Sequence, residues 1–351
     1  MYLFAKIEID PSQATEIKKV KPTSFFEKFI DVLSLGKASG KVEKETFSAV
    51  AILEKIYAGL HSIKVDNIIR LAVDEYDFYF DDSGQESDMD DAISHFTHKV
   101  DPIESELFET LFLVMEHSVD SLKLLIEIRI NRKHKVGEYP IVIIVNAVVN
   151  EFQAGDNLAL EQIKEKMKNI FANANEYNDF VDRQKRIFDS FINQLEYAVR
   201  KYIEADDIRR ESKIQVIRPK SKMKSKKSIK HTKKSKPAYY GYYGFDDYFL
   251  YAWLWGDMMH EYNIYTHNID IVDELGNEVM HIGDNGFNAA DSDTLNSDAD
   301  FEPVKNADIE YYRDNEYESE IKNDDWDSGS ADSDSTGFYD DSSDADFDNN
   351  D

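Results

Sequence analysis

The chain has 351 residues, a formal net charge of −29 and no cysteine. Without cysteine it cannot form disulfides, thiolate zinc sites or cysteine nucleophiles. The charge is unevenly placed: residues 218–236 hold ten Lys and Arg and no acid, whereas residues 238–351 hold 31 Asp and Glu against three Lys and Arg. We therefore expect a folded domain, a cationic connector and a strongly anionic tail.

The first residues predict a strand. Residues 2–9, YLFAKIEI, are apolar with partial alternation and are followed by Asp10-Pro11, a stop signal. A basic leader, a long apolar core and a small-residue cleavage site do not follow one another here, so we expect no secretory signal. No stretch approaches 18 consecutive apolar residues, so no spanning helix is expected either.

The rest of the first hundred residues carries mainly helix signals, with one clear strand. In order, the predictions are a short helix opened by the capping box of Ser24 and Glu27 and ended at Gly36, a helix over about 44–60, a segment over 65–73 that fits either type, a strand over 76–80, and a short helix over about 91–98 capped by Ser87 or Asp90.

The clearest strand signals lie between residues 107 and 149. Residues 107–117 and 122–131 are two long apolar runs joined by a short turn, and residues 141–149 are apolar on both faces. In the second run Leu and Ile alternate with Lys, Glu and Arg, which indicates one buried and one polar face. We predict a three-stranded antiparallel meander with a central third strand, joined by strands 2–9 and 76–80.

Two helices are predicted after the meander, over 158–171 and from Asn178 to about Ile208. Strands followed by helices that cover one sheet face define an α+β domain. Residues 238–265 then contain a dense cluster of Tyr, Phe and Trp, and residues 269–272 and 279–282 predict a β-hairpin.

The predicted organisation has four parts. They are an α+β globular domain (1–210), a basic Lys/Ser-rich linker (211–237), an aromatic-rich segment with the hairpin (238–284), and a disordered Asp/Ser tail (285–351). The third part is either a small module or an extension docked on the first domain.

The basic run is a candidate anion-binding segment, because clustered cations bind nucleic-acid phosphates, anionic lipid heads or acidic partners. The alternative is a solvated linker that is neutralised by the tail. The candidate residues are Arg218, Lys220, Lys222, Lys224, Lys226, Lys227, Lys230, Lys233, Lys234 and Lys236.

The run of residues 248–255 is too short to span a bilayer, but Trp and Tyr suit its interface. Beside a polybasic segment this favours lipid over nucleic acid, whose phosphates Asp246, Asp247 and Asp257 would repel. The alternative is that the aromatics are core. The candidate interfacial residues are Tyr248, Phe249, Tyr251, Trp253 and Trp255.

Residues 257–261 also suggest a metal site. Asp257, His260 and Glu261 lie at helical spacing, and His267 or His281 would complete the ligand set. The spacing lacks the paired histidines of metalloproteases, and exposed His and acids are common near turns. Elsewhere, Glu116-His117 is the most notable polar pair, and no phosphate loop, nucleophile elbow or dinucleotide fingerprint is present.

These observations lead to three hypotheses. The first is a non-enzymatic interaction or scaffold protein without cofactor, cytoplasmic and peripheral to a membrane, whose α+β domain binds a protein partner. Its basic and aromatic segments would engage an anionic surface, a membrane face, and the acidic tail would compete in cis. The second is a nucleic-acid-associated protein with a phosphate-mimicking tail. The third is a metal-dependent hydrolase that uses His260 and its neighbours.

Overall fold

A computed structural model describes residues 1–11, 40–74, 76–81, 86–95, 108–133, 137–150, 160–218, 248–272 and 278–295. The predicted helix from Ser24 to Gly36, the lysines of the basic run and the tail from residue 296 lie outside these ranges. The helices and strands are, in chain order, β1 (Tyr2–Pro11), α2 (Gly40–Ser62), β2 (Asn67–Val73), β3 (Tyr76–Phe80), α3 (Met89–Ser94), β4 (Thr110–Val119), β5 (Leu122–Asn131), β6 (Ile141–Val149), α5 (Leu160–Met167), α6 (Ala174–Tyr202), β7 (Ala205–Ile217), α7 (Tyr248–Glu261), β8 (Tyr265–Thr266), β9 (Ile269–Val272), β10 (Glu278–Ile282), β11 (Phe287–Asn288) and the 3₁₀ turn η3 (Ala289–Asp291).

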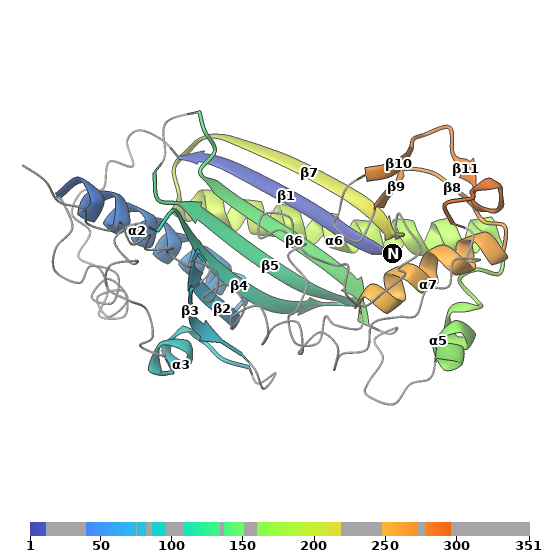
Figure 1. The fold of residues 1–351 in the computed structure, drawn as a ribbon, viewed down its shortest axis with the longest axis horizontal. Coiled ribbons are helices and arrows are strands. Elements are labelled where there is room, and N and C mark those ends of the chain that lie inside the picture. Colours follow the sequence, from blue (N-terminus) through green and yellow to red (C-terminus); the bar gives the residue numbers. More distant parts are fainter. Residues whose placement is uncertain are drawn as a thin grey trace, which may run out of the picture. The chain divides into compact units, whose positions relative to one another are not determined.

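Nine of the described strands form one sheet in the order β10-β9-β7-β1-β6-β5-β4-β2-β3 (Figure 1). Neighbouring strands pair antiparallel, except that β7 and β9 run parallel. The strands β8 and β11 form a separate two-stranded pair. The predicted fold class is therefore confirmed: an α+β fold with a large, mostly antiparallel sheet and packed helices.

The predicted meander of β4, β5 and β6 is present, and β6 lies between β5 and β1 as its apolar faces predict. The alternating Leu and Ile side chains of β5, from Leu122 to Ile130, belong to the main core. The ambiguous segment over 65–73 is the strand β2. The short helix α3 forms with Asp88 as its N-cap, in place of the predicted Ser87 or Asp90, because the Asp88 side chain accepts from the Asp91 N–H.

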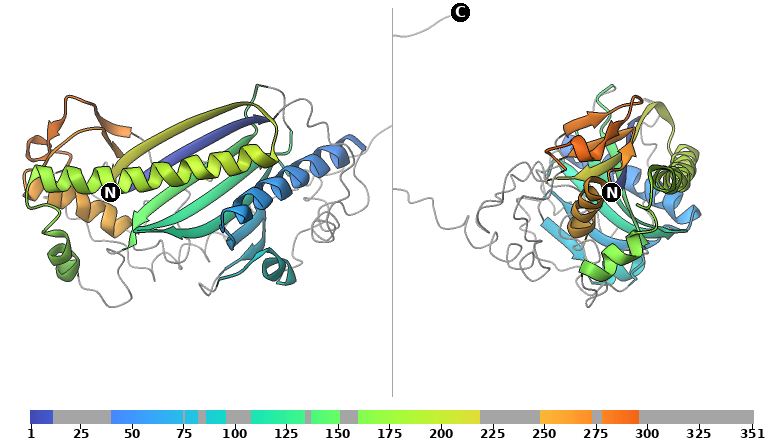
Figure 2. Two further views of the ribbon diagram at one scale, coloured as in Figure 1. Left: turned by 180° about the vertical axis from the view of Figure 1, so that it is seen from behind. Right: turned by 90° about the vertical axis from the view of Figure 1, so that its right-hand side faces the viewer.

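Helices α2 and α6 cover one face of the sheet (Figure 2). The two helices approach closely at Gly59, where an added Cβ would lie 3.2 Å from the carbonyl oxygen of Ala198. Helix α6 begins at the N-cap Asn173 and buries an apolar stripe of Phe, Val, Ile and Leu.

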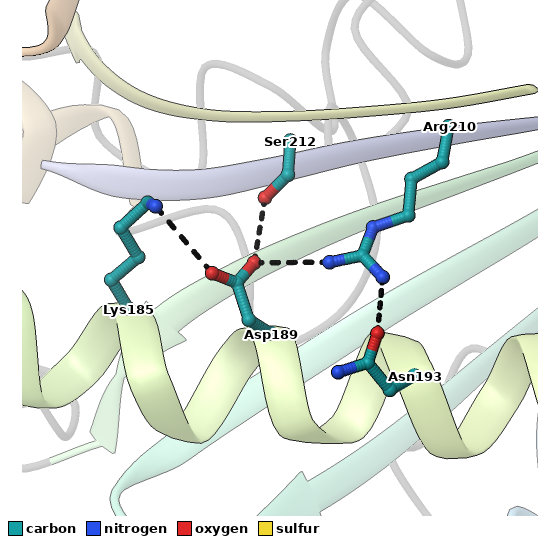
Figure 3. A network of polar contacts seen from close by, with 5 residues as sticks. All are labelled: Lys185, Asp189, Asn193, Arg210 and Ser212. Carbon is teal, nitrogen blue, oxygen red and sulfur yellow. Dashed lines mark hydrogen bonds and ion pairs between the residues drawn. The ribbon is translucent and has the colours of Figure 1, made fainter.

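The sequence prediction for the end of α6 was wrong. The helix ends at Tyr202, and the predicted helical residues up to Ile208 belong to the long strand β7, which pairs with β1. Polar contacts hold this strand to α6 (Figure 3). The Asp189 carboxylate accepts from Ser212 Oγ at 2.9 Å and lies 3.6 Å from Arg210 Nη2, and Arg210 also donates to the side chain of Asn193.

The other face of the sheet carries ion pairs between neighbouring side chains. They are Lys6–Glu8 (2.6 Å), Arg70–Asp77 (2.5 Å), Lys123–Glu116 (2.9 Å), Arg129–Glu127 and Lys213–Glu211 (2.6 Å). Between them lies a small apolar cluster that includes Tyr2, Val114 and Leu125. Each cation of this set has a carboxylate partner.

The predicted hairpin forms as β9 and β10 and extends the main sheet through β7. The chain leaves the sheet after β7, returns through α7, and enters the parallel neighbour β9. The predicted boundary between residues 210 and 211 falls inside β7. Of the two arrangements considered for the described part of this region, the structure has the extension docked on the first domain.

Candidate functional site

The basic segment starts at a residue that lies inside the fold. Arg218 follows β7 directly, and its backbone N–H donates to the carbonyl of Val272 on β9 at 2.7 Å. Its side chain is 3% exposed, and Nη2 donates to Asp257 Oδ1 on α7 at 3.1 Å and to the carbonyl oxygen of Leu295. The start of the basic segment is thereby tied to α7, the helix that follows the segment.

A glycine allows α7 to approach this arginine. A Cβ on Gly256 would lie 2.8 Å from Arg218 Nε and 3.2 Å from a methyl carbon of Val216. Contacts shorter than 3.0 Å force atoms to shift, so a side chain here would separate the helix from the strand. Gly256 therefore positions Asp257, the next residue, against the guanidinium.

The ion pair is almost completely enclosed, because the Asp257 side chain is 9% exposed. Burial lowers the pKa of Arg218 and the charge of Asp257 opposes that shift, so the guanidinium keeps its charge at neutral pH. Burial and the nearby Arg218 charge also lower the pKa of the Met1 amino group well below its usual range. Each charge of the pair is compensated by the other, and loss of either leaves a buried charge alone.

A cluster of aromatic side chains joins α7 to α6 beside this pair. Trp255 is 2% exposed, and its Nε1 donates to the hydroxyl oxygen of Tyr177 at 3.1 Å. The Tyr177 hydroxyl donates to the sulfur of Met259 at 3.3 Å, and burial raises the pKa of Tyr177 to about 12. The rings of Phe171 and Phe180 lie 5.0 and 5.9 Å from that of Trp255. This part of the aromatic run is core.

The prediction that Trp255 lies at an interface is therefore corrected. Helical spacing turns Leu254, Trp255, Met258 and Met259 toward the sheet and α6, where apolar rings lose contact with water. The side chains of the other four predicted interfacial residues, Tyr248, Phe249, Tyr251 and Trp253, lie outside the described residues.

Arg218 is likewise corrected as a surface anion-binding residue, since Asp257 and the Leu295 carbonyl surround its charge. The other nine predicted residues lie outside the described residues; they are Lys220, Lys222, Lys224, Lys226, Lys227, Lys230, Lys233, Lys234 and Lys236.

The predicted metal ligands do not form the group of ligating side chains that the structure brings together. Asp257 is engaged with Arg218, and His260 and Glu261 lie at the end of α7, separate from His267 beyond β8. In the part of the chain that the structure describes, the group that gathers is Asp270, Glu278 and His281, whose ligand atoms all lie within 4.8 Å of one another.

This hairpin group is built on a cross-strand pair. Asp270 on β9 is the register partner of His281 on β10, and Asp270 Oδ1 lies 2.6 Å from His281 Nδ1. The Asp270 side chain is 5% exposed, whereas that of His281 is 62% exposed. The hydrogen bond and the charge of Asp270 raise the pKa of His281. Lys213 Nζ on β7 lies 3.3 Å from the second oxygen of Asp270.

Sequence reasoning named His281 as a candidate ligand but missed Asp270, Glu278 and Lys213. The predicted strands already contained Asp270 and His281, and their pairing register would have set the two side chains opposite each other. Lys213 carried no such signal, because β7 itself was not predicted.

No described helix is both long and apolar enough to cross a bilayer. Comparison with known proteins finds no matching family, no similar curated protein and no similar solved structure.

Proposed function

We propose that this protein is a non-enzymatic interaction protein whose folded body presents a lysine segment to an anionic surface, the headgroups of a membrane face. The observation that carries this proposal is the ion pair between Arg218 and Asp257. It ties Arg218, the first residue of the basic segment, to the helix α7 that follows the segment, so residues 219–247 start and end on one folded unit.

Nine lysines between Lys220 and Lys236 supply the attraction. Each base close to an anionic leaflet contributes about 1 kcal/mol, and the attraction falls off within a Debye length. No shaped cleft is needed for this mode of binding. With Arg218 and Trp255 inside the fold, the proposal rests on the lysines, with any aromatic contribution left to Tyr248, Phe249, Tyr251 and Trp253.

The charge of the described sheet favours lipid over nucleic acid. A nucleic-acid-binding domain usually carries a basic stripe that follows the phosphate backbone. The cations on the polar face of the sheet are instead paired with carboxylates, as in Lys123–Glu116 and Lys213–Glu211. On this face of the described sheet, the named cations therefore do not form a basic stripe that would extend the lysine segment along a nucleic-acid strand.

The acidic C-terminal residues complete the proposal as a competitor in cis. Residues 297–351 hold 20 Asp and Glu, and they are covalently linked to the lysines. Tethering gives such a competitor an effective concentration of about millimolar for a short flexible connection. Membrane binding is then weaker in the full chain than in a chain that ends at residue 296.

The test is co-sedimentation of the full chain with vesicles of phosphatidylcholine containing phosphatidylserine, and with phosphatidylcholine alone, at about 0.15 M salt. We expect binding to the anionic vesicles only. Replacing the nine lysines by glutamine should abolish it, and replacing them by arginine should preserve it, because arginine keeps the charge. Circular dichroism checks that both variants keep the fold.

Two results would contradict the proposal. One is binding to anionic vesicles that the glutamine variant retains. The other is the absence of vesicle binding together with salt-dependent, lysine-dependent binding of a single-stranded oligonucleotide, which would favour the nucleic-acid hypothesis.

A further inference from the structure

The edge hairpin β9–β10 brings three metal-ligating side chains together on one face of the sheet. Asp270 and His281 face the same side because they are register partners. Glu278 is three positions before His281, and in a regular strand an odd separation would point the two side chains to opposite faces. Its place beside them therefore needs an explanation.

The explanation is a register shift between Glu278 and Met280. Glu278 pairs with Val272 and His281 pairs with Asp270, so Val279 is the additional residue of a β-bulge. Since positions 270 and 272 share a face, the bulge turns Glu278 to the side of Asp270 and His281. Bulges that redirect a side chain in this way are frequent beside functional sites.

The three side chains of this group differ in how firmly each is held in place. Asp270 is buried, and Lys213 holds its Oδ2 at 3.3 Å, which leaves Oδ1 directed to His281. An outer partner that orients a ligating carboxylate is typical of metal sites. Glu278 and His281 are exposed and can adjust around an ion. Ligand atoms about 2.1 Å from a tetrahedral ion lie about 3.4 Å apart. To hold an ion, Asp270 Oδ1 and His281 Nδ1 must therefore move apart from their 2.6 Å hydrogen bond, and the outer atoms of the group must draw in from as much as 4.8 Å.

The charge of the group matches a divalent cation. The carboxylates of Glu211, Asp270 and Glu278 and the ammonium of Lys213 together carry two negative charges when the imidazole is neutral. Lys213 keeps its shorter contact, 2.6 Å to Glu211, if Asp270 turns to an ion. One imidazole and two carboxylates suit Zn²⁺ and its first-row neighbours better than Ca²⁺ or Mg²⁺, which prefer oxygen ligands alone.

We propose that Asp270, Glu278 and His281 bind a divalent transition-metal ion of the Zn²⁺ type, which clips β10 to β9 at the edge of the sheet. The three protein ligands leave a coordination position for water or another donor. This site goes beyond the proposed membrane function and does not depend on it.

The experiment is a titration of the full chain, freed of metal by a chelator, with Zn²⁺ against a chromophoric competitor and with Co²⁺ followed by its visible absorption. We expect one equivalent to bind with an imidazole ligand. His281→Ala should weaken this binding at least tenfold, and so should Glu278→Gln, an exposed change that leaves the fold intact. The matched control His260→Ala should leave it unchanged. Zn²⁺ should raise the melting temperature of the wild type and not of His281→Ala.

The tail carboxylates make the control essential, because weak binding of divalent ions to scattered carboxylates would not need a histidine. Equal Zn²⁺ affinity in the wild type, His281→Ala and His260→Ala would mean that only such scattered carboxylates bind, and would overturn the proposal. Failure of the wild type to bind one equivalent would also overturn it, leaving an ion-pair network alone.

Discussion

Two acid–base groups lie at the end of β7, and they differ in burial. In the pair of Arg218 and Asp257 the side chains are 3% and 9% exposed. In the hairpin group Asp270 is 5% exposed while its partner His281 is 62% exposed. The enclosed pair can hold the fold together but cannot meet a ligand. The hairpin group contributes less to stability, yet it offers ligand atoms to solvent. Burial thus separates a structural role from a binding role.

The largest expected effect breaks the enclosed pair. Asp257→Leu or Arg218→Met should each lower the free energy of unfolding by about 3–5 kcal/mol, because each leaves a buried charge without its partner. The double variant should be more stable than either single variant, since two apolar side chains leave no charge uncompensated.

Urea unfolding of the four proteins at neutral pH measures this directly. Single variants as stable as the wild type, or a double variant that loses the sum of both single losses, would contradict the assignment of Arg218 and Asp257 as one coupled pair.

A smaller loss is expected in the aromatic cluster beside the pair. Tyr177→Phe removes the hydroxyl that accepts from Trp255 Nε1 and donates to Met259, while it keeps the ring. We expect a loss of about 1–3 kcal/mol, the usual result when a buried hydrogen-bonding group loses its partner. Tyr197→Phe, at a residue of α6 that is 73% exposed, is the matched control and should unfold like the wild type.

His117 is partly buried, and its protonation makes the free energy of unfolding depend on pH. Its ring stacks on Phe191 of α6 with centroids 5.6 Å apart, and burial lowers its pKa below 6.5. The unfolded chain therefore binds the proton first as pH falls, so the contribution of His117 to stability is complete above pH 6.5 and is lost below it. The unfolding free energy of the wild type minus that of His117→Gln should therefore decrease on acidification. A difference that is flat between pH 7 and pH 5 would exclude it.

The smallest effect on stability is expected at the hairpin group. Without metal, His281→Ala should leave the urea midpoint close to that of the wild type, because exposed ion pairs contribute little. A large loss of stability in this metal-free comparison would show that His281 holds the hairpin by itself, and the distinction between the two groups would fail.

The sequence predicted the strands whose residue pattern is regular along their length. The alternation of β5, the doubly apolar β6 and the β9–β10 hairpin all followed from residue pattern. The strand β7 did not, because its residues facing α6 include Arg210 and Ser212, which satisfy Asp189 and Asn193 and so break the apolar alternation. The first residues of β7 were instead assigned to the end of the predicted helix, which ran to about Ile208.

The candidate sites were harder to predict for a related reason. Arg218 is the first base of a run of ten, and nothing local distinguishes it from the others. Its burial depends on Asp257, which is distant in sequence, and on the absence of a side chain at Gly256. The hairpin group likewise depends on a bulge that the residue pattern of β10 does not indicate.

If the lysines on this folded body bind an anionic surface, removing them in a graded series should weaken the binding step by step. Three, six and all nine lysines between Lys220 and Lys236 are replaced by glutamine, and affinity for phosphatidylserine-containing vesicles is measured at constant salt. We expect a stepwise loss of about 1 kcal/mol in binding free energy for each lysine removed and no binding to neutral vesicles. An affinity that does not change along the series, or that is equal on neutral vesicles, would contradict this expectation.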